Sequence, residues 1–273
     1  MQTFYHCVWD YKEKDEDLLK KEGIKYEWYR DSSCSWLIVD ILESKPACSK
    51  VLEMAKDSLL FRYHEYSLTD LNKAEYLTMR ARNMSFDLAQ EENMFDFSEP
   101  IAPDLWRHKH LKKNIRFYVK NTVKWGKSHI KASFSMSEYH LFCDDVAAVF
   151  FSDYKGVKMH SVYHHRTGEA MENMHYLEFC HVLPNDVICF DKEQSDVCPK
   201  CGTKTWLIKT DHQLFLHKSA LQKDLIFAKT QDIWGGGGSF RHSLNIISQK
   251  AYQAMKDAGL ASRNLLFEPV VLV

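Results

Sequence analysis

The chain has 273 residues, of which 45% are hydrophobic and 13% aromatic, enough for a packed core in one large domain or two small ones. The formal net charge of −1 argues against general binding to nucleic acid or to an anionic membrane. There is no run of about 20 apolar residues, which argues against a membrane helix, and the N-terminus lacks the pattern of a signal peptide. We therefore expect a cytoplasmic protein whose eight cysteines stay reduced.

The first part of the chain predicts a mixture of strands and helices. The first thirty or so residues mix charges of both signs, which is typical of a solvated surface segment beside an early strand. Trp36–Leu42 is rich in bulky and β-branched residues and predicts a strand. After Pro46, apolar residues at helical spacing predict a helix: Cys48, Val51, Leu52, Ala55 and Leu59.

A longer helix is expected from about Leu71. Its apolar stripe repeats at steps of three and four and consists of Leu71, Ala74, Leu77, Ala81, Met84 and Leu88. Such a stripe is typical of a face that packs into a core rather than of a cofactor site.

The second half is expected to be mainly β-structure. Alternating or apolar runs predict strands at Ile115–Val119, His129–Met136, Val157–Tyr163, Met174–Leu183 and Thr205–Ile208. The pattern of Ser137–Phe151 fits a helix or a strand equally well.

The end of the chain predicts a β–α–β unit. Ser248 follows an apolar run and is placed to cap a short helix. The buried face of that helix is expected to consist of Ala251, Ala254, Met255 and Ala258. Gly259 is the expected left-handed stop, and Leu265–Val273 predicts a final strand.

Together these patterns predict an α+β fold with mixed and antiparallel sheets, a few helices, a small cysteine-knuckle insertion and the C-terminal β–α–β closure. We expect an N-terminal α/β region over residues 1–104 and a C-terminal β-rich region over residues 105–273, or one continuous domain.

The strongest chemical motif is Cys198-Pro199-Lys200-Cys201-Gly202. Two thiolates two residues apart in a turn can hold a structural Zn²⁺, which needs two further ligands. Cys180 and Cys189 are our choice for these, with His181, His212 and His217 as alternatives. The alternative is a knuckle that binds no metal, in which Cys180 and Cys189 are ordinary buried residues of strands. The remaining cysteines, Cys7, Cys34, Cys48 and Cys143, are expected to be mostly small core residues.

Charge separates into two blocks near the middle of the chain. Residues 83–104 carry six acids and no Lys or Arg, whereas residues 105–137 carry nine bases and no acid. Our guess for a partner-binding surface is the acidic stretch Asp87–Asp104 or the basic block, which is interleaved with aromatic residues and represented by Arg107, Lys109, Lys112, Lys113 and Arg116. The bland alternative is a solvated face that pairs with the acidic block.

No catalytic signature is present. His160, His164 and His165 cluster, and Glu172 and His175 have the spacing of a di-iron motif, but that motif occurs once and lies on a predicted strand. The glycines 235–238 lack the Lys-Ser/Thr ending of a phosphate-binding loop. We therefore expect a protein that is not an enzyme.

The ending resembles that of bacterial immunity proteins of polymorphic toxin systems, namely the double-CxxCG family and its relatives. The resemblance rests on the order C-P-K-C-G, D-I-W, N-I-I-S, A-Y-Q-A-M-K-x-A-G-L and L-L-F-E-P-V over roughly the last 75 residues. This chain has one CxxCG instead of two, so it lacks the second pair of cysteines that could bind a metal in that family. The resemblance implies a non-catalytic cytoplasmic protein that binds and blocks a cognate toxin domain, with Cys198 and Cys201 as metal positions.

Two other interpretations remain. A zinc-ribbon protein would use the knuckle and the basic block to bind nucleic acid, with a steep salt dependence. An enzyme with an unrecognised site would lose its activity when one His or Glu, for instance His164 or Glu172, is changed.

Overall fold

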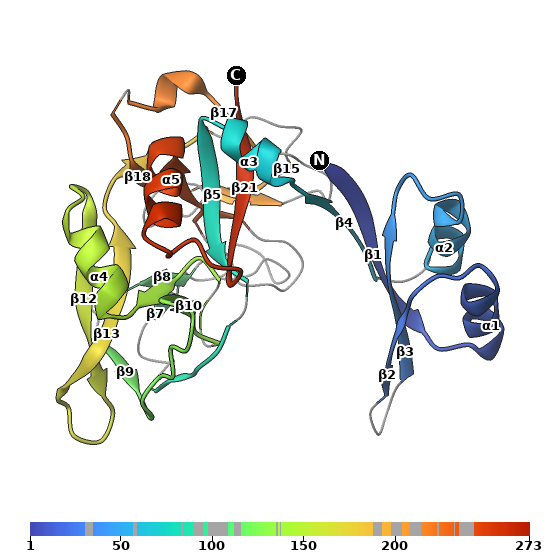
Figure 1. The fold of residues 1–273 in the computed structure, drawn as a ribbon, viewed down its shortest axis with the longest axis horizontal. Helices are drawn as coiled ribbons and strands as arrows, with labels where there is room; N and C mark the ends of the chain where they lie inside the picture. Colours follow the sequence, from blue (N-terminus) through green and yellow to red (C-terminus); the bar gives the residue numbers. More distant parts are fainter. Residues whose placement is uncertain are drawn as a thin grey trace. The chain divides into compact units, whose positions relative to one another are not determined.

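The computed structural model describes residues 1–30, 35–56, 59–82, 84–89, 95–97, 109–111, 116–134, 136, 138–187, 193–197, 204–207, 214–222, 224–231, 233–234 and 243–273. It is an α+β protein whose chain divides into two compact units (Figure 1). Residues Met1–Asp70 belong to the N-terminal unit, and the described residues from Leu71 onward belong to the C-terminal unit. The division expected after residue 104 lies outside the described residues. No helix in the described ranges is long and apolar enough to cross a membrane.

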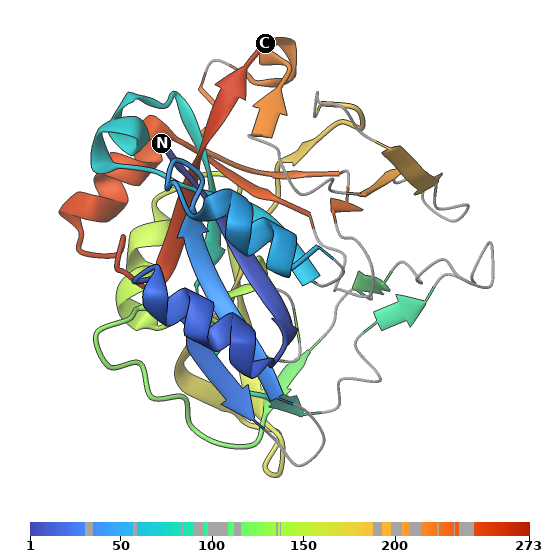
Figure 2. The same cartoon turned by 90° about the vertical axis from the view of Figure 1, so that its right-hand side faces the viewer.

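The N-terminal unit is one antiparallel sheet with two helices. In chain order it consists of β1 (Gln2–Asp10), α1 (Glu13–Lys21), β2 (Glu27–Arg30), β3 (Ser35–Leu42), α2 (Cys48–Met54) and β4 (Leu59–Glu65). The strands lie in the order β2-β3-β1-β4, which is the split β–α–β arrangement of ferredoxin-like topology. Figure 2 shows α1 and α2 side by side across one face of this sheet.

The core of the N-terminal unit lies between the helices and one face of the sheet. Alternate residues of β1 and β3 point to this face, because successive side chains of a strand point to opposite sides. Cys7 and Trp9 pair with Val39 and Leu37 in the register of β1 and β3, and all four are buried. The helices contribute buried Leu19, Cys48 and Val51 to the same cluster.

Two expectations for this unit are confirmed and one is partly wrong. The strand at Trp36–Leu42 and a helix after Pro46 are present, although the helix ends at Met54 and Leu59 begins β4. The first thirty residues are more than a solvated segment. They include β1, which lies between β3 and β4 and buries Cys7.

The C-terminal unit contains two six-stranded sheets. The first has the order β14 (Val182–Leu183), β18 (Phe227–Thr230), β20 (Asn245–Ser248), β5 (Tyr76–Ala81), β21 (Leu265–Leu272) and β17 (Leu214–Leu216). The second has the order β10 (Ile130–Ala132), β11 (Leu141–Cys143), β13 (Ala170–Phe179), β12 (Val157–His164), β9 (Phe117–Val119) and β6 (Leu88–Ala89).

The remaining described elements are short. The smaller sheets consist of β15 (Glu193–Val197), β16 (Lys204–Leu207) and β19 (Ile233–Trp234), and of β7 (Phe95–Phe97) and β8 (Lys109–Leu111). The helices are α3 (Leu68–Lys73), which spans the division between the units, α4 (Asp145–Ser152), α5 (Gln249–Asp257) and the 3₁₀ helix η2 (Lys218–Ala220). Each of the five strands expected in the second half has a counterpart, although His129–Met136 contains only the short β10 and Met174–Leu183 is divided between β13 and β14.

The main core of the C-terminal unit joins its two large sheets. Leu77 and Met79 of β5 belong to the same buried cluster as Leu177 of β13. Phe151 of α4 and Met255 of α5 complete it. The ambiguous stretch Ser137–Phe151 resolves into β11 followed by α4, because Asp144 caps the helix: its Oδ1 accepts a hydrogen bond from Ala147 N at 3.0 Å.

The predicted β–α–β unit at the end of the chain is confirmed, but its helix buries Tyr252 and leaves Ala258, expected on the buried face, exposed. Ser248 Oγ accepts a hydrogen bond from Ala251 N at 3.2 Å, and Gly259 has a φ of +72°, as a left-handed stop requires. The two strands of this unit, β20 and β21, lie on either side of β5 and are both antiparallel to it. Figure 1 shows β5 and β21 side by side.

The helix predicted from Leu71 to Leu88 is wrong. The helix α3 ends at Lys73, and Leu77 and Ala81 lie in the strand β5. Residues four apart share a face on a helix and also on a strand, so this part of the stripe fits both. Pairing with β20 and β21 on both sides determines the outcome, because it buries Leu77, Thr78 and Met79 in succession.

Candidate functional site

Of the four expected zinc ligands, one lies in a described part of the chain. Cys198, Cys201 and Cys189 lie outside the described residues. Cys180 directly follows β13 and is half-buried, with its Sγ 3.8 Å from the carbonyl oxygen of Glu178. Burial raises the pKa of the Cys180 thiol. Within the described ranges, no three His, Cys, Asp or Glu side chains are placed to hold a metal ion, so the zinc site stays a prediction.

The five bases expected to bind a partner are described only in part. Arg107, Lys112 and Lys113 lie outside the described residues, and Lys109 lies in β8. Arg116 is exposed, and its guanidinium carbon lies 5.1 Å from the centre of the Tyr163 ring. This stacking fits a solvated base on a sheet surface and does not by itself define a binding site.

Two histidines of the second large sheet, His160 and His175, bind carboxylates. His175 Nε2 lies 2.8 Å from Asp145 Oδ1, and His160 Nε2 lies 2.8 Å from Glu178 Oε2. In β13, His175 pairs with Cys143 and Ser161, and Glu178, three residues further along, pairs with Lys158. Because successive side chains of a strand point to opposite faces, the two His–carboxylate pairs lie on opposite faces of the sheet. The spacing of Glu172 and His175 therefore reflects a strand, with His175 held by Asp145.

The pair at His160 belongs to a larger polar cluster around β13. Burial favours a raised pKa for Glu178, but the hydrogen bond from His160 and the charge of Lys229 outweigh it and lower the pKa. Next to it, His140 Nδ1 lies 3.1 Å from the hydroxyl of Tyr176, whose pKa is raised by burial. These contacts join neighbouring strands, and we interpret the cluster as structural.

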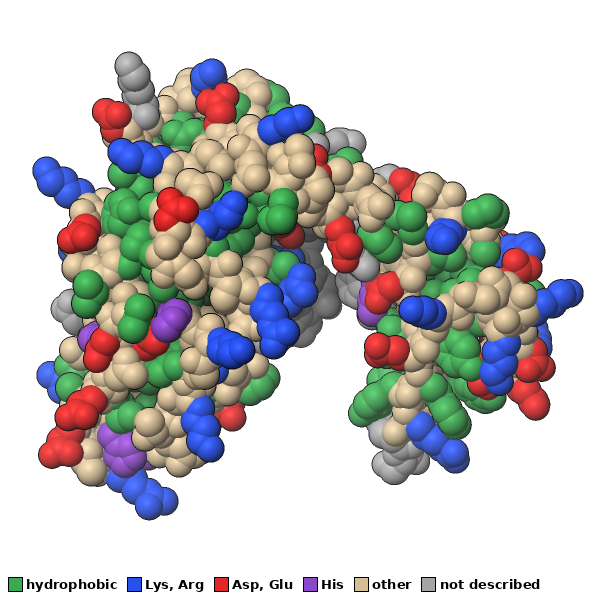
Figure 3. Space-filling model, in the orientation of Figure 1, with side chains coloured by type: hydrophobic (Ala, Val, Ile, Leu, Met, Phe, Trp, Pro, Cys, Tyr) green, Lys and Arg blue, Asp and Glu red, His purple; other side chains and the backbone are tan. Residues whose placement is uncertain are grey.

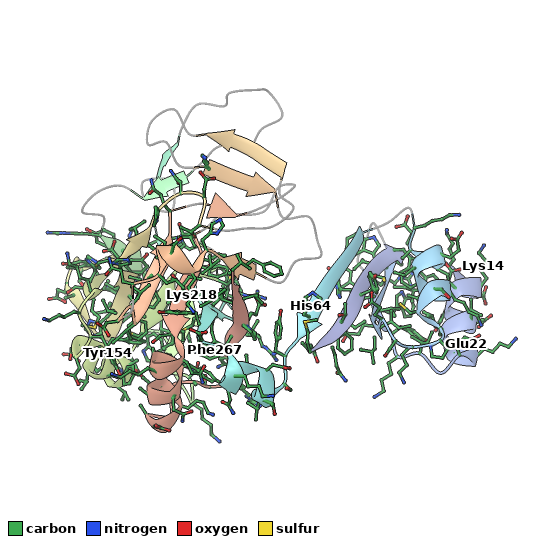
Figure 4. The ribbon with its side chains drawn as sticks, turned by 90° about the horizontal axis from the view of Figure 1, so that it is seen from above. Lys14, Glu22, His64, Tyr154, Lys218 and Phe267 are labelled. Carbon is green, nitrogen blue, oxygen red and sulfur yellow. The ribbon has the colours of Figure 1, made fainter. Side chains whose placement is uncertain are left out.

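The surface most suited to binding lies in the N-terminal unit and was not anticipated from the sequence. We call it the open face: the side of the sheet opposite α1 and α2. Figure 4 shows α1, marked by Lys14, and the adjoining Glu22 on the helical side of the sheet. Alternation in the strands places on the open face Phe4, His6, Val8 and Asp10 of β1, Trp36, Ile38, Asp40 and Leu42 of β3, and Glu27 and Tyr29 of β2.

The part of the open face around Tyr29 and Trp36, toward one end of the sheet, is apolar and aromatic. Tyr29 pairs with Trp36, and their rings stack with centroids 5.5 Å apart and an interplanar angle of 16°. The side chains are 48% and 36% exposed, although they are large and lie within a folded sheet. Val8 pairs with Ile38 beside them, and both are half-buried. Contiguous exposed apolar areas on a protein surface often mark interaction sites.

Acids lie beside this apolar part and at the far end of the open face. Exposed Asp10 pairs with Trp36, exposed Glu27 pairs with Ile38, and exposed Glu65 of β4 pairs with Gln2. Asp40 is also on this face, where its Oδ1 lies 2.9 Å from His6 Nδ1. Among the strand side chains that the structure describes on this face, none is Lys or Arg. In the space-filling view, apolar, acidic and basic side chains all reach the surface of this unit (Figure 3).

The opposite side of the same strand gives a useful contrast. Trp28 is 53% exposed but points to the helical side, where its ring stacks on Tyr11 at 5.4 Å. Nearby, Glu16 accepts hydrogen bonds from Tyr11 and Tyr26 and pairs with Lys20 at 2.8 Å. The helical side therefore uses its aromatic and charged groups within the unit.

Comparison with protein-family models, with curated proteins and with solved structures finds no match for this chain.

Proposed function

We propose that this chain is an immunity protein that binds a cognate bacterial toxin domain by direct contact, with the open face as a contact surface. The observation that carries the proposal is the stacked, exposed Tyr29–Trp36 pair near one end of that face. Tyr and Trp are the residues most often found at the energetic centres of protein interfaces, because they bury a large area and lose little conformational freedom.

The position of these rings adds support. Tyr29 and Trp36 are on neighbouring antiparallel strands, so the backbone holds both rings in place before a partner arrives. A preformed surface avoids the entropy cost of ordering loops on binding, which favours tight association. A protein that must silence a toxin made in the same cell needs such association.

The resemblance of the last 75 or so residues to immunity proteins supports the same function from a different part of the chain. In this proposal the protein works in the cytoplasm and is not an enzyme. A structural Zn²⁺ held by Cys198 and Cys201, with Cys180 and Cys189, would stabilise the knuckle. Metal analysis of the purified protein should find about one Zn²⁺ per chain, lost in a Cys198→Ser/Cys201→Ser variant.

The proposal is tested by capture and neutralisation. The full chain, tagged, is used to capture partners from its native bacterium, and each captured protein is identified by mass spectrometry. The partner is then expressed alone and together with this chain. We expect a partner that stops growth when expressed alone and that is silenced at a ratio near one to one. Nucleic acid without a protein partner would favour the zinc-ribbon alternative instead.

Two matched variants locate the surface. Trp36→Ala removes an exposed ring from the open face, and Trp28→Ala removes an equally large exposed ring from the helical side. We expect Trp36→Ala to weaken binding of the toxin at least about tenfold, in the range of an interface hot spot, and Trp28→Ala to leave it unchanged. Equal effects of the two variants would exclude the open face as the contact surface.

A further inference from the structure

We infer that the partner contacts the open face through a basic surface, the kind of surface with which a protein holds the phosphate backbone of a nucleic acid. The inference rests on the proposed function and adds the chemistry of the partner. Its basis is the distribution of charge in the N-terminal unit.

The negative charge of the open face is unbalanced. Asp10, Glu27 and Glu65 come from three different strands. Asp10 and Glu27 lie beside the apolar part of the face, and Glu65 lies at the opposite end of the sheet, where it pairs with Gln2. On the helical side, by contrast, two acids have bases beside them: Lys20 pairs with Glu16 at 2.8 Å and Lys50 pairs with Glu22 at 2.5 Å. In sequence, Met1–Asp70 carry ten Lys or Arg and 14 Asp or Glu, so this unit is more acidic than the whole chain.

Acids beside an exposed apolar area define the complementary partner. Charged groups at an interface rim guide the encounter of two proteins and exclude partners of the same charge. A partner for this face must therefore present Lys or Arg around apolar groups. A protein that binds nucleic acid needs a surface of this composition. Its Lys and Arg side chains contact the phosphates, and its aromatic side chains stack on the nucleobases.

The geometry at one end of the face gives a specific subsite. Asp10, Trp36 and Tyr29 lie in one row across β1, β3 and β2. An arginine of the partner could stack on the Trp36 ring while its guanidinium binds the Asp10 carboxylate, so that cation–π and ionic contacts act together. In this subsite the Trp36 ring takes the place of a nucleobase, and the Asp10 carboxylate takes the place of a phosphate, as ligands of the partner's arginine.

The test uses the full chain and the purified toxin domain identified by capture. Asp10→Lys/Glu65→Lys reverses two charges of the open face, and the matched control Glu13→Lys/Asp17→Lys reverses two exposed acids of α1. Association rates are measured between about 0.05 and 0.3 M salt, where screening of exposed charges changes strongly. A heparin fragment serves as the competing polyanion, and neutral dextran is its control.

We expect the open-face double variant to associate at least about tenfold more slowly at low salt, and the control variant to stay within about twofold of the unchanged chain. Heparin should displace the toxin, dextran should not, and the toxin alone should cleave or bind DNA or RNA. Suppose that the chain silences a toxin, but that the association rate does not change with salt, with heparin or in the open-face variant. This result would overturn the inference and leave the proposed function intact. If no toxin is silenced, both fall.

Discussion

Arg80 Nη2 lies 3.1 Å from Glu268 Oε1, and this ion pair joins the strand β5 to the strand β21. The other terminal nitrogen of the same guanidinium lies 3.2 Å from Glu138 Oε1. The pKa of Arg80 is raised: burial opposes the charge, and the neighbouring Tyr139, Glu268 and Glu138 outweigh it. One cation thus connects three segments that are far apart in sequence.

Removal of this cation should destabilise the C-terminal unit. Arg80→Met leaves two carboxylates near each other without their shared partner, and we expect a loss of about 2 kcal/mol in the free energy of unfolding, since the group is mostly but not fully buried. Denaturant unfolding followed by circular dichroism measures the change. The matched control is Arg82→Met, an exposed arginine two residues away, which should cost less than about 0.5 kcal/mol. Similar losses in both variants would contradict the proposed role of the ion pairs.

Acid should weaken the N-terminal unit through Glu16. Hydrogen bonds from Lys20, Tyr26 and Tyr11 lower the pKa of Glu16 to about 2, whereas an unfolded glutamate has a pKa of about 4.3. The folded state therefore binds the proton less readily, so this contribution to stability is present above about pH 4.3 and is lost as the pH falls toward 2. Glu16→Gln should flatten this part of the pH dependence, measured as the urea midpoint of Trp fluorescence. Parallel curves for the variant and the unchanged chain would rule out Glu16 as a source of the acid sensitivity.

Two cysteines should be inert in the folded protein. Burial raises the pKa of Cys7 and of Cys143 to about 12, and neither side chain is accessible. Because the thiolate is the reactive form, iodoacetamide at pH 8 should label neither residue in the native state and both in urea. Peptide mass spectrometry follows each site separately. Native labelling of Cys7 at the rate seen in urea would show that the core of the N-terminal unit opens readily.

The sequence predicts best where the signals are local. The cap at Ser248, the helix after it and the stop at Gly259 lie within a dozen residues, and the structure confirms all three. The strand β5 was mistaken for a helix because its spacing fits both. Its structure depends on β20 and β21, which lie far along the chain and which local patterns do not connect to it.

The open face was missed for a related reason. In β3 the residues Trp36, Ile38 and Leu42 look like core residues, since the strand is apolar on both sides. Only the sheet order and the position of α1 and α2 determine which side is covered. The alternation of Asp10, Glu27 and Asp40 with apolar residues was the one available signal, and it needed the strand register to become visible.

The position of β5 also has a consequence for how the protein is made. Both of its neighbours, β20 and β21, leave the ribosome long after β5 does. The sheet of the N-terminal unit can assemble while translation continues, because its strands β1 to β4 pair only with one another. The apolar strand β5, with Leu77 and Met79, must instead wait for the last segments to be synthesised. During that interval, chaperones or temporary contacts must cover β5 to prevent aggregation.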